Sequence, residues 1–313
     1  MKTTLKVLGS IVALIILFVA GFLAYVSFKS PKSYTVPTSN LTVEVTPERI
    51  ANGQRMASML CIQCHANDQN QLTGKLMKDV PAEFGQVYSK NITAHPDLGI
   101  GKWTDGEIYV MLRTGIKPDG TTGLFMPKFP LMAEDDVKDI IAWLRSEDYS
   151  LAPVADEAPP TQASLLGKFL RDFVFKPTPM PSAPIARPDT NNLVALGEYV
   201  VNKQIACFAC HSKDFKTMNE LEPTKSEGYC GGGNPMLNLQ GEVVYSTNIT
   251  FDETGIGSYT EDEFIQAVKY GKKKNGEQVR YPMVPHTQLT DTEVKGIYAY
   301  LKTVPKLKTP SVK

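Results

Sequence analysis

The sequence predicts an all-α protein that has one membrane-spanning helix at its N-terminus and two tandem domains of similar plan behind it. Three observations support this prediction. The stretch from Val7 to Phe28 carries no charged residue, the pentapeptide Cys-x-x-Cys-His occurs at 61–65 and again at 207–211, and helix-start signals recur in both halves. A chain of 313 residues has room for roughly two domains of 100 to 150 residues. Its formal net charge of zero argues against a nucleic-acid partner.

The uncharged stretch from Val7 to Phe28 matches the length of about 20 residues that a helix needs to cross a bilayer. A cleaved signal peptide is the alternative, but its apolar core is usually shorter, about 7 to 15 residues. We therefore assign residues 1–32 to a transmembrane anchor. The polar, proline-containing residues 33–45 are expected to form a tether that holds the first domain off the membrane.

Three helices are expected in the first domain, residues 46–148. A Thr-Pro pair at 46–47 is typical of a helix start, with threonine as N-cap and proline at the first helical position. This helix should run through Met59 and deliver the first pentapeptide. A second helix begins at 104–107, where Thr and Glu have capping-box spacing. The third covers 135–145 and has one apolar face, made of Val137, Ile140, Ile141 and Leu144.

The second half of the chain repeats this plan at a constant offset. Asn-Ile-Thr occurs at 91–93 and at 248–250, so the offset is 248 − 91 = 157. The pentapeptide histidines are separated by only 211 − 65 = 146, which means that 11 residues are inserted in the second half. Asn91 and Asn248 also fit the glycosylation pattern, but their place in a longer matched block favours a structural role.

The second domain is assigned to residues 191–306, and 307–313 form a tail. Capping-box pairs at 260–263 and 290–293 are expected to open its later helices. The inserted residues contain Cys230, the fifth cysteine, followed by three glycines.

A proline-rich linker, residues 149–190, joins the two domains. One amphipathic segment interrupts it at 165–175, with the sequence LLGKFLRDFVF. Packing on the chain's own domains is the simpler interpretation of this segment. Contact with a partner or with the membrane surface is the alternative.

The pentapeptide Cys-x-x-Cys-His has the spacing that lets two thiols bond the vinyl groups of a haem while the histidine ligates its iron. Its two copies use four of the five cysteines and two of the four histidines. A thioredoxin-like redox pair would require a βαβ context, and a zinc site usually has ligand pairs closer in sequence. The sequence therefore predicts two covalently bound haem c groups, attached or ligated by Cys61, Cys64, His65, Cys207, Cys210 and His211.

Each haem iron is expected to take a methionine as its sixth ligand, because a soft thioether sulfur stabilises the ferrous state. Met126 and Met283 share the offset of 157, each lies beside a proline, and each precedes the last helix of its domain. Proline stiffens such a loop. His286 is the rival ligand in the second domain, although its counterpart in the first is Phe129.

These motifs resemble the class I c-type cytochromes over nearly all of the chain outside the first forty residues and the linker. The Gly-Ile-Gly that follows each Asn-Ile-Thr, with an aromatic residue behind it, looks like the pattern of cytochrome c subunits of membrane-bound alcohol and sugar-acid dehydrogenases. The resemblance implies two tandem cytochrome c domains, with helices and loops wrapped around each haem. Those subunits usually carry three such domains, whereas this chain has two.

The resemblance implies an electron carrier rather than an enzyme, anchored by one span in the cytoplasmic membrane with its haem domains on the periplasmic side. The expected partners are the membrane and redox proteins, such as a dehydrogenase subunit, a quinol-oxidising complex, a soluble cytochrome or a terminal oxidase. The alternative is a dihaem enzyme, either a cytochrome c peroxidase or a thiosulfate dehydrogenase. Cys230 keeps the second option open, because thiosulfate enzymes use a cysteine near one haem.

Overall fold

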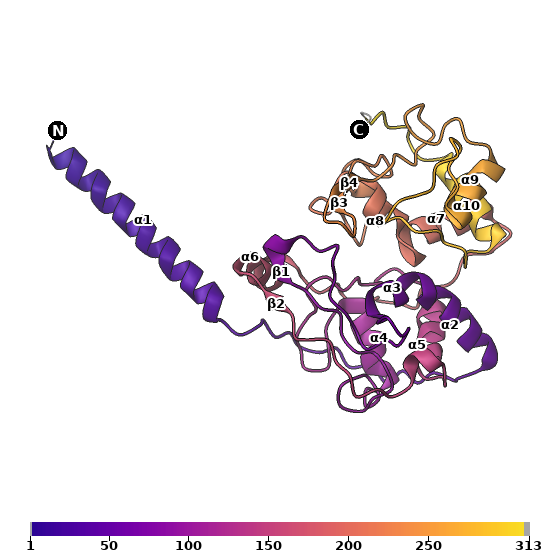
Figure 1. Cartoon of the computed structure of the whole chain (residues 1–313), viewed down its shortest axis with the longest axis horizontal. Helices are drawn as coiled ribbons and strands as arrows, with labels where there is room; N and C mark the ends of the chain where they lie inside the picture. The colour runs from indigo at the N-terminus through magenta and orange to yellow at the C-terminus, as the bar shows by residue number, and fades with distance from the viewer. Residues whose placement is uncertain (1, 310–313) are drawn as a thin grey trace.

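The computed structural model describes residues 2–309, and most of the expected tail, 307–313, therefore lies outside the described residues. The described chain is mostly helical. Helix α1, Lys2–Phe28, extends away from the rest of the molecule (Figure 1). Its segment Thr3–Phe28 has a mean hydropathy of 2.8 and is long and apolar enough to cross a membrane. The predicted apolar helix is thus present, although its N-terminal end lies a few residues before Val7.

The first lobe, residues 41–152, surrounds one of two hydrophobic clusters. Its helices are α2 (Pro47–Leu60), α3 (Ile62–His65), α4 (Asp105–Thr114) and α5 (Glu134–Leu144), with short 3-10 turns η1 (Ala82–Phe84) and η2 (Tyr149–Leu151). Thr46 caps α2 by accepting a hydrogen bond from the backbone N–H of Arg49, and Thr104 and Glu107 form a complete capping box on α4. The three predicted helices are therefore confirmed, and every helix end for which a position was predicted lies within two residues of it.

The second lobe, residues 193–309, surrounds the other cluster. It contains α7 (Leu193–Tyr199), the π-helical turn η4 (Val200–Gln204), α8 (Cys207–His211), the 3-10 turn η5 (Pro223–Lys225), α9 (Glu261–Tyr270) and α10 (Asp291–Leu301). Both predicted capping boxes form, on α9 and on α10.

Each lobe packs its first helix against its last helix at a glycine. A Cβ atom on Gly53 of α2 would lie 1.9 Å from the carbonyl oxygen of Asp139 in α5. A Cβ atom on Gly197 of α7 would lie 1.9 Å from the carbonyl oxygen of Gly296 in α10. Only the missing side chain lets these backbones approach so closely, so the two lobes use the same helix crossing.

Two short antiparallel pairs accompany the helices, which the all-α prediction did not include. Strand β1 (Gly85–Gln86) pairs with β2 (Gln162–Ala163), and β3 (Pro235–Leu237) pairs with β4 (Val243–Tyr245). Strands of two or three residues are too short to show the alternation of apolar and polar residues that would predict them. The first pair ties the linker to the first lobe.

The amphipathic segment of the linker forms α6 (Leu165–Phe169) and a π-helical turn, η3 (Leu170–Val174). It lies beside the C-terminal end of α1 (Figure 1). The segment therefore packs on the apolar N-terminal helix as well as on the first lobe.

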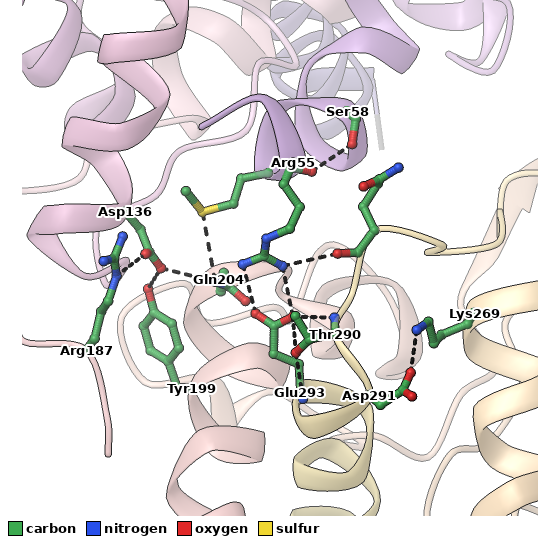
Figure 2. Close-up of polar contacts among 12 residues, drawn as sticks. Arg55, Ser58, Asp136, Arg187, Tyr199, Gln204, Lys269, Thr290, Asp291 and Glu293 are labelled. Carbon is green, nitrogen blue, oxygen red and sulfur yellow. Dashed lines mark hydrogen bonds and ion pairs between the residues drawn. The ribbon is translucent and has the colours of Figure 1, made fainter. Parts of the chain in front are cut away.

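Polar side chains join the two lobes (Figure 2). Arg55 of α2 makes two hydrogen bonds to the carboxylate of Glu293 in α10. The hydroxyl of Tyr199 in α7 donates to Asp136 in α5, which also accepts hydrogen bonds from Arg187 and Gln204. The carboxylates of Glu293 and Asp136 thus each receive hydrogen bonds from the opposite lobe, so the network fixes how the lobes meet.

Candidate haem sites

The first pentapeptide forms the single helical turn α3 directly after α2. Residues three and four apart lie on the same side of a helix, so Cys61, Cys64 and His65 are presented together. Cys61 ends α2 and begins α3, and it is buried with His65. The second pentapeptide forms α8 in the same way, after Ala206, whose φ of 57° turns the chain into that helix. No disulfide joins any of the five cysteines, all of which lie in the described part of the chain.

The ring of His65 is oriented by a backbone carbonyl. Its Nδ1 lies 2.6 Å from the carbonyl oxygen of Lys90. The same contact recurs in the second lobe, where Nδ1 of His211 lies 2.8 Å from the carbonyl oxygen of Thr247. Because a carbonyl can only accept, Nδ1 carries the proton in both rings and the lone pair of Nε2 stays available. This is the arrangement in which histidine binds a metal through Nε2.

Burial lowers the pKa of both histidines below its ordinary value. Each imidazole is therefore neutral at pH 7, as ligation requires. Burial also raises the pKa of the Cys61 and Cys207 thiols to about 12, so both side chains are uncharged sulfurs beside the imidazoles. Two thiols and a neutral imidazole with a free Nε2 are the donor set that covalent haem attachment needs, and these residues fit haem c.

The repeated Asn-Ile-Thr segments hold the two carbonyls in place. Asn91 follows Lys90 directly, and its side chain accepts hydrogen bonds from the N–H and hydroxyl of Thr93 at 2.8 and 2.7 Å. Asn248 follows Thr247 and makes the same pair of bonds to Thr250, both at 2.8 Å. Both asparagines are buried.

The role of these carbonyls was missed by the sequence prediction. A backbone group carries no sequence signal of its own. The signal that could have found it is the repeated Asn-Ile-Thr block, which directly follows the accepting carbonyl in both lobes.

Met126 and Met283 lie at equivalent places, in the loop before the last helix of each lobe. Met126 is half-buried against the first hydrophobic cluster. Its neighbour Phe125 contacts the rings of Phe84 and Phe175, with centroids 5.3 and 5.8 Å away. Met283 is half-buried in the loop between α9 and α10.

The loop that carries Met283 reaches the first lobe. The hydroxyl of Tyr281 donates to the carboxylate of Asp79 at 2.7 Å. Burial, followed by that carboxylate and by the nearby Cys64, raises the pKa of Tyr281. Residues just before the second methionine thus lie next to the first pentapeptide.

The two remaining histidines differ in their surroundings. His95 accepts hydrogen bonds at Nδ1 from the backbone N–H groups of Asp97 and Leu98, so this nitrogen is occupied. Nδ1 of His286 is buried, and nothing in the described part of the chain bonds to it. Burial and the neighbouring His211 lower the pKa of His286. His286 thus lies near His211 and has a ring nitrogen that no described residue bonds, so it remains the rival ligand at the second site.

Cys230 is fully buried in the second hydrophobic cluster. Its φ of 60° is uncommon for a residue that has a side chain. Burial raises the pKa of its thiol to about 12, so the sulfur is a neutral thiol at pH 7. A thiolate nucleophile or ligand needs a lowered pKa, which this environment does not supply.

Comparisons with known proteins agree with this geometry. Residues 48–144, which contain the first pentapeptide and Met126, match the family model of the cytochrome c oxidase cbb3-type subunit III. This part of the chain is therefore similar to a c-type cytochrome domain.

The chain as a whole is also similar to several named proteins. It is 28% identical over 274 residues to the cytochrome c subunit of a quinone-dependent alcohol dehydrogenase from Gluconobacter oxydans, covering 82% of this chain and 55% of that subunit. It is 26% identical to the gluconate 2-dehydrogenase cytochrome c subunit of Pantoea cypripedii, covering 78% and 56%. It is 25% identical to a dihaem c-type cytochrome of Cereibacter sphaeroides, covering 79% and 82%. The chain spans about half the length of the dehydrogenase subunits that it matches.

Proposed function

We propose that this protein is a membrane-anchored dihaem cytochrome c that carries electrons from a dehydrogenase at the outer face of the cytoplasmic membrane. The observation that carries the proposal is the repeated histidine geometry. In both lobes Nδ1 of the pentapeptide histidine is held by the carbonyl that precedes Asn-Ile-Thr, which leaves Nε2 for an iron. Each site would hold one haem. Two sites in one chain would let electrons pass from one haem to the other within the protein.

The two lobes correspond to two tandem cytochrome c domains, 46–148 and 191–306, joined by the linker 149–190. Haem c supplies one-electron chemistry when it is bound, and the protein contributes attachment, ligation and burial. Cys61 and Cys64 hold one haem and His65 ligates it, while Cys207, Cys210 and His211 do the same for the other. Met126 and Met283 complete the two ligand sets. Thioether ligation raises the reduction potential, which suits a carrier.

The N-terminal helix α1 anchors the protein by a single span, with both lobes on the periplasmic side. Three relatives that match about four fifths of the chain are named as cytochrome c subunits of alcohol, gluconate and fructose dehydrogenases. A dehydrogenase subunit is therefore the electron donor that we favour. A quinol-oxidising complex, a soluble cytochrome and a terminal oxidase are candidate acceptors.

Haem stoichiometry tests the proposal directly. Protein purified from membranes should keep its haem through acid-acetone extraction, and the pyridine haemochrome should give two haems per chain. Cys207→Ala with Cys210→Ala should reduce this to one covalent haem and leave the spectrum of the first site unchanged. A single haem in the parent protein, or haem that the solvent extracts, would overturn the dihaem assignment.

A further inference from the structure

The segment α6–η3 of the linker leaves an apolar surface exposed. Gly167 faces the first lobe so closely that a Cβ there would lie 2.5 Å from the carbonyl oxygen of Phe84. Four apolar side chains that do not face the first lobe are exposed, with exposed fractions from 36% to 49%: Leu165, Leu166, Phe173 and Val174. Four large apolar side chains within ten residues form the kind of patch that marks an interaction surface.

The same segment packs on the apolar helix α1. The ring of Phe22 contacts Phe169 and Phe173, with centroids 6.3 and 6.0 Å away. Val26 is buried to 2% exposure in this contact. A pocket of about 300 Å³ lies between the two elements and is lined entirely by apolar side chains, namely Phe22, Leu23, Val26, Leu165, Leu166 and Phe169. The apolar surface of the segment is therefore continuous with that of the membrane helix.

The depth of this contact follows from the length of α1. Its apolar segment Thr3–Phe28 has 26 residues, which at 1.5 Å per residue span about 39 Å. The hydrocarbon core of a bilayer is about 30 Å thick. Phe22 lies six residues before the end of the helix, or about 9 Å along its axis. The contact with α6–η3 thus lies where the helix leaves the hydrocarbon and enters the headgroup region.

Basic side chains border the apolar patch. The ammonium of Lys168 donates to the carbonyl oxygen of Ser27 at 2.8 Å, and that of Lys29 lies 5.9 Å from the ring centroid of Phe173. The buried carboxylate of Asp172 pairs with Arg171 and accepts a hydrogen bond from the backbone N–H of Lys32, which ties the segment to the chain just after α1. Large apolar side chains beside lysine and arginine are typical of helices that lie in the membrane interface.

From these contacts we infer that α6–η3 lies in the lipid interface and that its exposed apolar side chains insert into the membrane next to α1. The inference rests on the proposed membrane anchor. It deepens that proposal, because a protein held by one helix can rotate relative to the membrane. A second membrane contact would fix the orientation of the first lobe.

The segment also connects the membrane to the first haem site. Strand β2, directly before α6, pairs with β1 of the first lobe. Phe175, directly after η3, contacts the ring of Phe125, the neighbour of Met126. A lipid-bound α6–η3 would therefore hold the loop of the first methionine at a fixed height above the membrane.

Photolabelling from the lipid phase tests this inference on the complete haem-loaded protein. Phosphatidylcholine that carries a diazirine in its acyl chain is incorporated in liposomes with the protein, and carbene adducts are mapped by mass spectrometry. We expect adducts on α1 and several-fold more adduct on peptides of residues 165–174 than on peptides around Leu221. Leu221 is the matched control, because its exposed fraction of 44% is close to the 43% of Leu166 and it lies on the second lobe, outside the segment.

A double variant, Leu166→Glu with Phe173→Glu, should lose the adducts on 165–174 while α1 stays labelled and both haem spectra stay unchanged. Adducts on α1 without adducts on 165–174 in the parent protein would overturn the inference and leave the anchor standing. A protein subunit that covered the patch would also prevent adducts on 165–174, and it would overturn the inference in the same way. A chain in which α1 itself takes no label would overturn the anchor, and the interfacial placement with it.

Discussion

Arg55 of α2 and Glu293 of α10 form a two-point ion pair across the contact between the lobes, with N–O distances of 2.8 and 3.1 Å. The side chain of Glu293 is only 9% exposed, and that of Arg55 is 24% exposed. The same carboxylate accepts hydrogen bonds from the N–H and hydroxyl of Thr290, so it caps α10 as well. One residue thus links the start of the last helix to the first lobe.

Replacing Arg55 by methionine should destabilise the contact between the lobes. The change leaves a nearly buried carboxylate without its cation, and we expect a loss of about 3 kcal/mol, the lower end of the range for breaking a buried pair, because Arg55 is partly exposed. Denaturant unfolding of the purified protein measures the loss. The control is Lys308→Met, because the ion pair of Lys308 with Glu253 is more than 70% exposed on both sides and such pairs contribute little. Equal stability of the Arg55 variant and the control would contradict the structural role of the pair.

The helices could be predicted from the sequence because their signals are local. Thr104, Thr260 and Thr290 each have a glutamate three residues later, and all three form complete capping boxes. The contact between the lobes carries no such signal. Arg187 and Tyr199 lie 51 and 63 residues from Asp136, the carboxylate that joins them, and only the folded chain brings them together.

The haem residues show the same division. The pentapeptides could be predicted from the sequence because covalent haem attachment fixes their spacing. The carbonyls of Lys90 and Thr247 that orient the histidines could not, because any residue supplies a backbone carbonyl. The place of α6 was open for another reason. Its amphipathic pattern favoured packing on the chain's own domains, with contact to a partner or the membrane surface as the alternative. The structure shows contacts with the first lobe and with the apolar helix α1.

Asp148 should make the first lobe sensitive to acid. Burial alone would raise the pKa of its carboxyl, but hydrogen bonds from Ser150, Trp143 and Gln54 together lower this pKa below its ordinary value. The unfolded chain then binds the proton more readily than the folded one. The stability from Asp148 is therefore complete above its ordinary pKa of about 4 and is lost as the pH falls towards the lower folded-state value.

Asp148→Asn should remove this component. We expect the variant to be less stable than the parent by about 1 kcal/mol at pH 7, because an amide accepts these hydrogen bonds less well than a carboxylate. The difference should shrink as the pH falls below about 4. Thermal unfolding at pH 7 and pH 3 provides the measurement, with exposed Asp68→Asn as control. A difference that stays constant with pH would show that the Asp148 charge is irrelevant.

Met126→Ala and Met283→Ala should each open one haem alone. The oxidised parent protein should show the methionine-to-iron charge-transfer absorption for two haems, and each variant should lose half of it. The opened haem should bind carbon monoxide when reduced. The reduction potential of that haem should fall, by part of the roughly 0.8 V range over which ligands set haem potentials. Redox titration with optical detection resolves the two haems.

The second site offers a direct choice between two ligands, because His286 has a buried Nδ1 near His211. If Met283 is the ligand, His286→Ala should leave the charge-transfer absorption intact. An intact absorption in Met283→Ala, with carbon monoxide binding in His286→Ala instead, would assign the ligand to histidine.

Cys230 separates a carrier from an enzyme. A thiosulfate-oxidising site would need a reactive sulfur near the second haem, and Cys230 lies in the same hydrophobic cluster as Cys207. However, burial raises the pKa of the Cys230 thiol to about 12, so fewer than about one in ten thousand of these side chains is ionised at pH 7. Cys230→Ser should accordingly leave the spectrum and potential of the second haem as they are, and neither protein should turn over thiosulfate. The matched comparison is Met283→Ala, which changes that same haem. If Cys230→Ser altered the second haem or abolished a thiosulfate turnover present in the parent, the cysteine would be functional and the carrier proposal would be wrong.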